Sequence, residues 1–523
     1  MHIVRNSKPT STRSASGQFS SRLGMMLTMM GMAIGTGNIW RFPRMAAQNG
    51  GGEFLIAWVV FLFLWSIPLI LVEFGTGRKT RSGPTKAFIL MMGPRWAWMG
   101  AFAAFVTTAI TFYYSVVAGW TLCYTFAALT GAIPESTPGQ FWMDYTASAW
   151  PIITHAVIIF LTTLVVGRGV VAIEKVAKVL MPTLLCLILL LVIRAITLPG
   201  ASDGLSFMFT VDWANLANAR IWVEALTQNA WDTGAGWGLV LCYAVYLRQS
   251  EDTVLNAFVL PVANNVVSLL AGIMVFCTVF SAVPVLVSNL AVQPESLAAY
   301  PELTTAVESG QELNTDLIQE TIFNQSNEGL TFIWMPQLFA SIPFSSFFMV
   351  LFFLSLSVAA FTSMMAQVEV TTRTLVDAGV NRSKAIRWVG VGIFVLGFPS
   401  AISLRVLRNQ DWVWGVALIL AGLFFAIAVI KHGVDRFRRE QLNHQDSDLH
   451  IPKWWNFVIR VIVPIEAMVL IVWFLVEAKA DDPERWLQPF MQYNVGTVLF
   501  QFALVLLVLI GANQWIVRRH LGD

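Results

Sequence analysis

The sequence has few charged residues, few histidines and few cysteines, and each shortage excludes a class of function. Charged side chains make up 12% of the 523 residues, about half the share found in ordinary soluble proteins. Most of the chain is therefore expected to lie in lipid. The net charge of +2 comes without a basic domain, which argues against a nucleic-acid partner.

The six histidines and four cysteines give no sign of reaction chemistry. The histidines show no metal-ligand spacing, and no nucleophile lies in a pattern with a base. The cysteines, Cys123, Cys186, Cys242 and Cys277, all fall in apolar segments, where the role of a small hydrophobic residue is expected. We therefore do not expect an enzyme. The polar N-terminus also lacks the features of a signal peptide.

Apolar runs of membrane-spanning length are abundant instead. Hydrophobic residues make up 56% of the chain, and runs of about 20 residues predict roughly twelve spans. Basic residues crowd positions 78–95 without an acid among them, whereas no lysine or arginine occurs over 249–372. The positive-inside rule then predicts cytoplasmic termini and an extracellular loop over 289–344, which we interpret as a lid.

The first predicted span contains residues that an unbroken membrane helix would not contain. Residues 31–43 read GMAIGTGNIWRFP, with glycines, an asparagine and an arginine close together. In hydrocarbon, broken backbone and charge are tolerated only where protein or a water-filled cavity surrounds them. An interruption of this kind indicates the binding site of a transporter.

The sixth predicted span repeats this pattern. Residues 228–238 read QNAWDTGAGWG. Interruptions in spans one and six indicate two five-span repeats, and because five is odd the second must be inverted relative to the first. Glycines in either segment alone could serve close helix packing, but both together favour a binding site. Unwound backbone leaves carbonyls that can bind a cation and amides that can bind an anion.

These features predict an all-α membrane protein with about twelve transmembrane helices, broken helices 1 and 6, and multiple passes through a cell membrane. The predicted organisation is a cytoplasmic tail over 1–21, a first five-helix repeat over 22–200, a second, inverted repeat over 201–433, and two C-terminal helices with a short cytoplasmic end over 434–523.

In these motifs the sequence resembles the neurotransmitter:sodium symporter family, and in particular its bacterial amino-acid transporters. The resemblance covers nearly the whole chain and includes Arg41-Phe42-Pro43, QNGGGEF over 48–54, Pro68 through Glu73, Tyr113-Tyr114 and Thr362-Ser363. It implies a transporter in a bacterial inner membrane that couples inward movement of Na⁺, expected as two ions, to uptake of a neutral amino acid by alternating access. Two alternatives stay open: an amino-acid sensor that does not transport, and a channel.

The resemblance also implies the residues of each site. The substrate would contact Ala33, Thr36, Gly37, Ile110, Tyr114, Trp231, Asp232, Gly234, Trp237, Thr362 and Gln367. The first sodium would bind to Ala33, Asn38, Asp232 and Asn264, and the second to Gly31, Ile34, Ala359, Thr362 and Ser363. Hard cations prefer oxygen ligands such as these. Without the resemblance, the hydroxyls of Thr362 and Ser363 could instead bond to the preceding helical turn.

Asp232 departs from the family pattern, which has a hydroxyl residue at this place. A carboxylate at mid-membrane costs about 3 kcal/mol or more without a partner, and a Na⁺ ion held by Asp232, Asn38 and Asn264 would offset that cost. A helix-capping role is compatible with the same placement. Gln228 and Ser268 resemble parts of the family's chloride site, but a fixed carboxylate would repel chloride. We therefore expect Asp232 to replace the chloride.

The resemblance implies two gates along the substrate path. Arg41 and Asp411 would pair on the extracellular side, although Arg41 could instead extend toward the outer interface. Tyr246 and Asp377 would belong to the cytoplasmic gate. The family's partner arginine for that gate is missing at its usual place, and Arg13 is the expected substitute.

Overall fold

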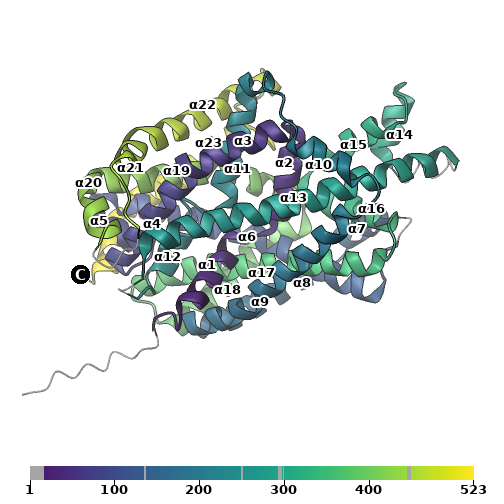
Figure 1. Cartoon of the computed structure of the whole chain (residues 1–523). Helices are drawn as coiled ribbons and strands as arrows, with labels where there is room; N and C mark the ends of the chain where they lie inside the picture. Colours follow the sequence, from purple (N-terminus) through teal and green to yellow (C-terminus); the bar gives the residue numbers. More distant parts are fainter. Residues whose placement is uncertain are drawn as a thin grey trace, which may run out of the picture.

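The computed structural model describes residues 17–134, 137–248, 251–292, 297, 300–444 and 449–522. Within these residues all regular elements are helical, and long helices run roughly along one direction (Figure 1). The start of α1 (Arg22–Ala33) and the C-terminus lie toward one end of the bundle, which we call the terminal side. The short helices α14 (Pro301–Glu308), α15 (Thr315–Phe323) and α16 (Met335–Ala340) lie toward the other, which we call the lid side.

Nine helices of the described part of the chain are long and apolar enough to cross a membrane. They are Gly52–Thr80 (α3 Gly52–Phe61, η3 Leu62–Ser66, α4 Ile67–Thr80), Pro94–Thr130 (mainly α6, Ala97–Thr130), Trp150–Gly167 (α8), Val170–Ile196 (α9), Thr253–Val292 (α13), Ser345–Asp377 (α17), Arg382–Ile402 (α18), Leu404–His432 (α19) and Trp454–Ala480 (mainly α22, Val463–Asp481). A further span is the pair α23 (Val495–Gly511) and α24 (Asn513–Leu521), bent by 55°.

Two more spans are each divided into shorter helices. They are α1 with η2 (Gly37–Arg41) and α2 (Phe42–Gln48), and α11 (Ala219–Asp232) with α12 (Leu239–Ala244). With them the described residues contain the predicted twelve spans, and the first and sixth are the broken ones. The predicted fold class is thereby confirmed.

The break in the first span is accompanied by close packing at Gly35. α1 ends at Ala33, and Ile34 is extended with φ −76° and ψ 102°. At Gly35 a Cβ atom would lie 3.0 Å from Ser363 Oγ and 3.1 Å from the hydroxyl oxygen of Tyr114. The missing side chain lets the unwound backbone approach both α6 and α17 closely.

The sixth span is broken by a different backbone conformation from that of the first span. Between Asp232, which ends α11, and Leu239, which begins α12, the glycines Gly234, Gly236 and Gly238 have φ of 71°, 86° and 77°. This left-handed region is open to glycine and disfavoured for other residues. The alternating glycines therefore end one helix and redirect the chain before the next.

A buried glutamate from the second span holds this redirected segment in place. The carboxylate of Glu73 on α4 accepts hydrogen bonds from the backbone N–H groups of Gly236 at 2.7 Å, Gly238 at 3.2 Å and Leu241 at 2.9 Å. These are donors that the start of a helix leaves without partners. A Cβ atom on Gly236 would also lie 2.6 Å from the Cα atom of Gly422, so the segment packs directly against α19.

Candidate substrate and sodium sites

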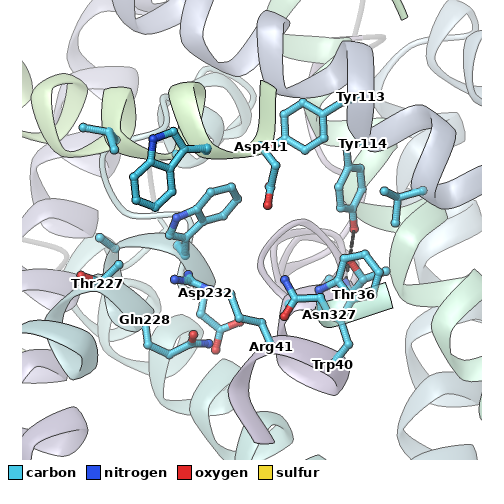
Figure 2. A pocket seen from close by; sticks show the side chains of 18 of the residues that line it. Thr36, Trp40, Arg41, Tyr113, Tyr114, Thr227, Gln228, Asp232, Asn327 and Asp411 are labelled. Atoms are coloured by element: carbon cyan, nitrogen blue, oxygen red, sulfur yellow. Dashed lines mark hydrogen bonds between the residues drawn. The ribbon is translucent and has the colours of Figure 1, made fainter. Parts of the chain in front are cut away.

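A cavity of about 470 Å³ lies where the two broken helices meet (Figure 2). Its lining continues to Asn327 and Glu328 in the lid loop and to Tyr493 before α23, so the cavity extends toward the lid side. The predicted substrate residues in its lining are Ala33, Thr36, Gly37, Tyr114, Trp231, Asp232, Gly234, Trp237 and Gln367. Two segments far apart in the sequence thus contribute to one site.

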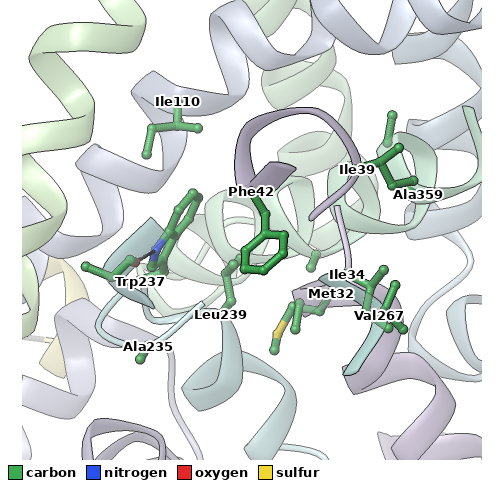
Figure 3. Close-up of a cluster of buried hydrophobic side chains, with 14 of the residues drawn as sticks. Met32, Ile34, Ile39, Phe42, Ile110, Ala235, Trp237, Leu239, Val267 and Ala359 are labelled. Carbon is green, nitrogen blue, oxygen red and sulfur yellow. Dashed lines mark hydrogen bonds between the residues drawn. The ribbon is translucent and has the colours of Figure 1, made fainter. Parts of the chain in front are cut away.

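Ile110 and Thr362 lie outside the lining of this cavity. Ile110 is fully buried in a cluster of apolar side chains (Figure 3). The hydroxyl of Thr362 lies 3.0 Å from the carbonyl oxygen of Val358 and 3.1 Å from that of Ala359. This is the bond to the preceding turn that threonine makes in a helix. In this structure neither side chain reaches the place predicted for the substrate.

Hydrogen-bond donors gather around the hydroxyl of Tyr114 (Figure 2). Its oxygen lies 3.3 Å from the backbone nitrogen of Thr36 and 3.4 Å from the Oγ1 atom of the same residue. Thr36 and Gly37 begin the second half of the broken span, where backbone N–H groups have no partner within the helix. Such an arrangement of donors suits a carboxylate.

Asp232 belongs to a polar cluster that joins α11, α13 and η2. Its Oδ2 atom accepts hydrogen bonds from Ser268 Oγ at 2.6 Å and from Asn264 Nδ2 at 3.4 Å. Asn38 donates to Asn264 Oδ1 at 3.0 Å and to Ser268 Oγ at 2.7 Å. The Oδ1 atom of Asp232 is buried and has no hydrogen-bond partner among the described residues. This oxygen-rich cluster has the chemistry that a hard cation requires.

A second group of oxygen atoms lies at the end of α1. Ser363 Oγ lies 3.3 Å from the carbonyl oxygens of Gly31 and Met32 and 3.2 Å from that of Ile34. A hydroxyl has one hydrogen to donate and can satisfy only one of these carbonyls at a time. The end of a helix leaves its last carbonyls without helical partners, so this group also offers ligands for a cation. The sequence prediction for the second sodium did not include Met32.

The predicted outer gate residues both line the cavity but do not touch. The guanidinium of Arg41 lies 5.3 Å from the ring centroid of Trp231, within the range of a cation–π interaction. Its Nη1 atom has no hydrogen-bond partner, and no ion pair joins Arg41 to Asp411 in the described part of the chain. Figure 2 shows Asp411 beside Tyr113 instead. This pair therefore does not close the lid side of the cavity, where Arg408 instead forms an ion pair with Glu328 at 2.6 Å.

The terminal side is closed by a network that includes the predicted Tyr246. Its hydroxyl donates to Glu369 Oε1 at 2.6 Å, and Arg382 forms an ion pair with Glu369 Oε2 at 2.5 Å. The ring of Phe19 packs edge-on against that of Tyr246, with centroids 6.4 Å apart. Arg248 donates to the carbonyl oxygens of Phe19 and Ser20. The start of α1 is thus fixed to the end of the sixth span.

The predicted Asp377 has other partners than an N-terminal arginine. It forms an ion pair with Arg373 at 2.9 Å and accepts a hydrogen bond from the backbone N–H of Gly83 at 2.6 Å. Arg13, the expected partner, lies outside the described residues.

The sequence prediction assigned no role to two acids that shape the site, although both lie in the motifs that carry the family resemblance. Glu369 anchors the closed network below the cavity, and Glu73 fixes the break in the sixth span. Each is a fully buried carboxylate within an apolar span, and such residues are rare and functional in membrane helices. That signal is visible in the sequence, but the partners are not, because they come from distant segments.

The comparisons with known proteins agree with this architecture. The model of the sodium:neurotransmitter symporter family matches residues 16–149 and 143–519. An uncharacterised sodium-dependent transporter of Methanocaldococcus jannaschii is 30% identical over 468 residues, which cover 86% of this chain and 88% of that protein. An uncharacterised sodium-dependent transporter of Bacillus subtilis is 28% identical over 479 residues, which cover 87% of this chain and 96% of that protein.

A solved structure has the same fold. The crystal structure of MhsT in complex with L-phenylalanine aligns with a TM-score of 0.71 at 27% identity, over 87% of this chain and 99% of that one. The resemblance found in the sequence motifs is confirmed. The chain is a multi-pass, sodium-dependent membrane transporter that belongs to the sodium:neurotransmitter symporter family.

Proposed function

We propose that the protein couples inward movement of Na⁺ to uptake of a neutral amino acid by alternating access. The observation that carries this proposal is the meeting of two broken helices at one cavity that is open toward the lid side and closed on the terminal side. The lid side would be extracellular and both termini cytoplasmic, in a bacterial inner membrane. The amino acid bound to MhsT supports this substrate class.

The substrate's two charged groups would bind to opposite sides of the cavity. Its carboxylate would accept hydrogen bonds from the N–H groups of Thr36 and Gly37 and from the hydroxyl of Tyr114. Its ammonium group would face the carbonyl oxygens of Ala33 and Trp231. Because Gly35 carries no side chain where the family's monoamine carriers have an aspartate, a carboxylate has room there.

Two sodium ions would occupy the two groups of oxygen atoms described above. Each Na⁺ that moves inward releases about 2.3 kcal/mol per 100 mV and about 1.4 kcal/mol per tenfold concentration gradient. Two ions with a zwitterionic substrate therefore supply about 7 kcal/mol, which corresponds to roughly 10⁵-fold accumulation. Binding of Na⁺ drives the cycle only because it favours one conformation over the other.

Asp232 would supply the negative charge that chloride supplies elsewhere in the family. The hydroxyl of Ser268 already donates to this carboxylate at 2.6 Å. A chloride ion placed beside the same hydroxyl would lie next to a fixed negative charge and would be repelled. We therefore propose that transport does not require chloride.

Uptake by the purified protein in proteoliposomes tests the proposed function. Labelled neutral amino acids should accumulate above their outside concentration when Na⁺ is higher outside, and a sodium ionophore should abolish this accumulation. Binding that saturates without uptake would support the sensor. Flux that only equalises concentrations would support the channel.

A further inference from the structure

Glu466 lies on the packed face of α22, close to the middle of its membrane span. It shares this face with Val463, Ala467 and Leu470, all of which are buried, whereas Ile465 is 54% exposed on the opposite face. Glu466 itself is 6% exposed. An acid therefore occupies one position of an otherwise apolar packing stripe.

The carboxyl group of Glu466 has no partner. Neither Oε1 nor Oε2 makes a hydrogen bond within the described part of the chain, and none of the ion pairs found there includes this residue. A charged carboxylate without a partner is strongly unfavourable inside a membrane, whereas a neutral carboxylic acid avoids most of that cost. The surroundings therefore favour the form that carries a proton.

Among the described residues, no charged side chain forms a hydrogen bond or an ion pair with Glu466. α22 packs mainly against α19, and also against α11, η3 and the preceding π-helical turn η9 (Val458–Ile462). The titratable or charged residues of these elements are Arg220, Glu224 and Asp232 on α11, Arg405, Arg408, Asp411, Lys431 and His432 on α19, Arg460 on η9, and Glu477, Lys479 and Asp481 on α22. Those on α19 lie toward its two ends, and Asp232 bonds to α13. η3 contributes none.

The same helix face continues from Glu466 into the central cavity. Leu470, Trp473, Phe474 and Glu477 follow at helical spacing, and all four line that cavity. The lining of the cavity therefore comes to within four residues of Glu466, about one helical turn.

The helices that pack against α22 belong to both the moving and the fixed parts of the proposed transport mechanism. α11 and η3 are parts of the sixth and second spans. In the proposed alternating access, spans 1, 2, 6 and 7 would move against the other spans. α19 belongs to the part against which they would move. A rearrangement of α11 and η3 would therefore change the contact of α22 with water.

We propose that Glu466 is a proton-binding site. Its carboxyl group carries a proton in the conformation described and releases it to water from the cavity when α11 and η3 move away from α22. Release breaks the O–H bond of the carboxylic acid and transfers the proton to a water molecule. The reverse step forms the same bond again. The presence of the proton is independent of the proposed function, whereas its coupling to the transport cycle rests on that function.

Infrared spectroscopy of the purified full-length protein in lipid tests the proton itself. The wild type should show at neutral pH a carbonyl stretching band of a protonated carboxylic acid that is lost in Glu466→Gln. The exposed Glu484 provides the control, since Glu484→Gln should retain the band. Glu466→Met is a second variant that keeps the stripe apolar. A spectrum unchanged in both Glu466 variants would overturn the proposal.

The pH dependence of uptake tests the coupling. In the wild type, the equilibrium constant between the two conformations should change by up to about tenfold per pH unit, the limit for one titrating group. Uptake should follow this change. In Glu466→Gln this response should be absent, while Glu484→Gln should behave as the wild type. Identical profiles for wild type and Glu466→Gln would overturn the coupling. If the wild type transported no amino acid, the proposed function would fail and the infrared experiment would still decide the proton site.

Discussion

Tyr114 is the residue at which loss of a single oxygen atom should most directly weaken substrate binding. Tyr114→Phe removes a hydroxyl close to the backbone nitrogen of Thr36 and leaves a charged carboxylate with one donor fewer. A hydrogen bond to a charged group contributes about 1.5–3 kcal/mol, so the KM for the amino acid should rise roughly 10- to 100-fold. Uptake kinetics in proteoliposomes measure this change.

A matched control removes the hydroxyl of a tyrosine that lies outside the cavity. The hydroxyl of Tyr145 lies 3.0 Å from Thr154 Oγ1, and Tyr145 does not line the central cavity. Tyr145→Phe should leave the KM unchanged. An equal rise in both variants would mean that the effect of Tyr114→Phe is not one of substrate recognition.

Replacing Asp232 should create a need for chloride. Asp232→Ser removes the fixed negative charge and frees the two donors that bond to it, the hydroxyl of Ser268 and the side-chain amide of Asn264. An anion can then bind where the carboxylate was. Wild-type uptake should persist in chloride-free medium, whereas uptake by Asp232→Ser should depend on the chloride concentration.

The control for this experiment is Asp203→Asn, which removes an exposed carboxylate from α10 (Ala201–Phe209). It should show no chloride requirement. Wild-type transport that collapses without chloride would refute the assignment of Asp232.

At the scale of single elements, the break in the sixth span depends on close packing as well as on glycine's conformational freedom. Gly236→Ala puts a side chain at φ 86° and places its Cβ atom 2.6 Å from Gly422 Cα. Left-handed strain costs about 1–2 kcal/mol, and overpacking adds about 1–3 kcal/mol. The variant should therefore lose both thermal stability and transport.

Gly169 separates these two effects. It has nearly the same φ of 87°, but a Cβ atom there would meet nothing within 4 Å. Gly169→Ala should show only the strain, with a small loss of stability measured by thermal unfolding in detergent and with transport retained. Equal effects in the two variants would show that the contact with Gly422 is unimportant.

The broken elements could be predicted from the sequence because glycines, an amide and ionisable residues interrupt apolar runs, and this signal is local. The orientation of Thr362 could not, because its bond to Val358 competes with any role at a site, and the motif does not say which bond forms. The partners of Glu73 and Glu369 also depend on which distant helices pack together. The sequence therefore predicts where helices break more reliably than it predicts what holds the breaks in place.

At the scale of the whole molecule, we expect closure of the terminal side to depend on the carboxylate of Glu369, which binds both Arg382 and Tyr246. Arg382→Gln removes its ion pair, and Tyr246 would remain as a neutral partner. A buried charge that loses its partner is strongly destabilising, so the population should shift toward a conformation that is open on the terminal side. Distances between spin labels on α1 and α18 should increase in the absence of Na⁺.

Arg387 is a suitable control because it lies exposed on the same helix, and within the described residues it bonds only to the backbone of Ser383. Arg387→Gln should leave the distance distribution unchanged. Unchanged distances in Arg382→Gln as well would show that this ion pair does not hold the molecule closed.

The sequence does not predict which conformational state the molecule adopts. The residues of both predicted gates are present, yet Arg41 and Asp411 stand apart while Tyr246 is engaged. The same side chains would be present in every state of a cycle, and their pairing distinguishes one state from another.

The stacking of Arg41 on Trp231 beside an open cavity has a consequence for pharmacology. A compound that enters from the lid side and slides beneath this indole would prevent the ring from moving, whether or not it resembled an amino acid. With the lid side extracellular, as proposed above, such an inhibitor would act from outside the cell, so it would not have to permeate the membrane or survive intracellular metabolism.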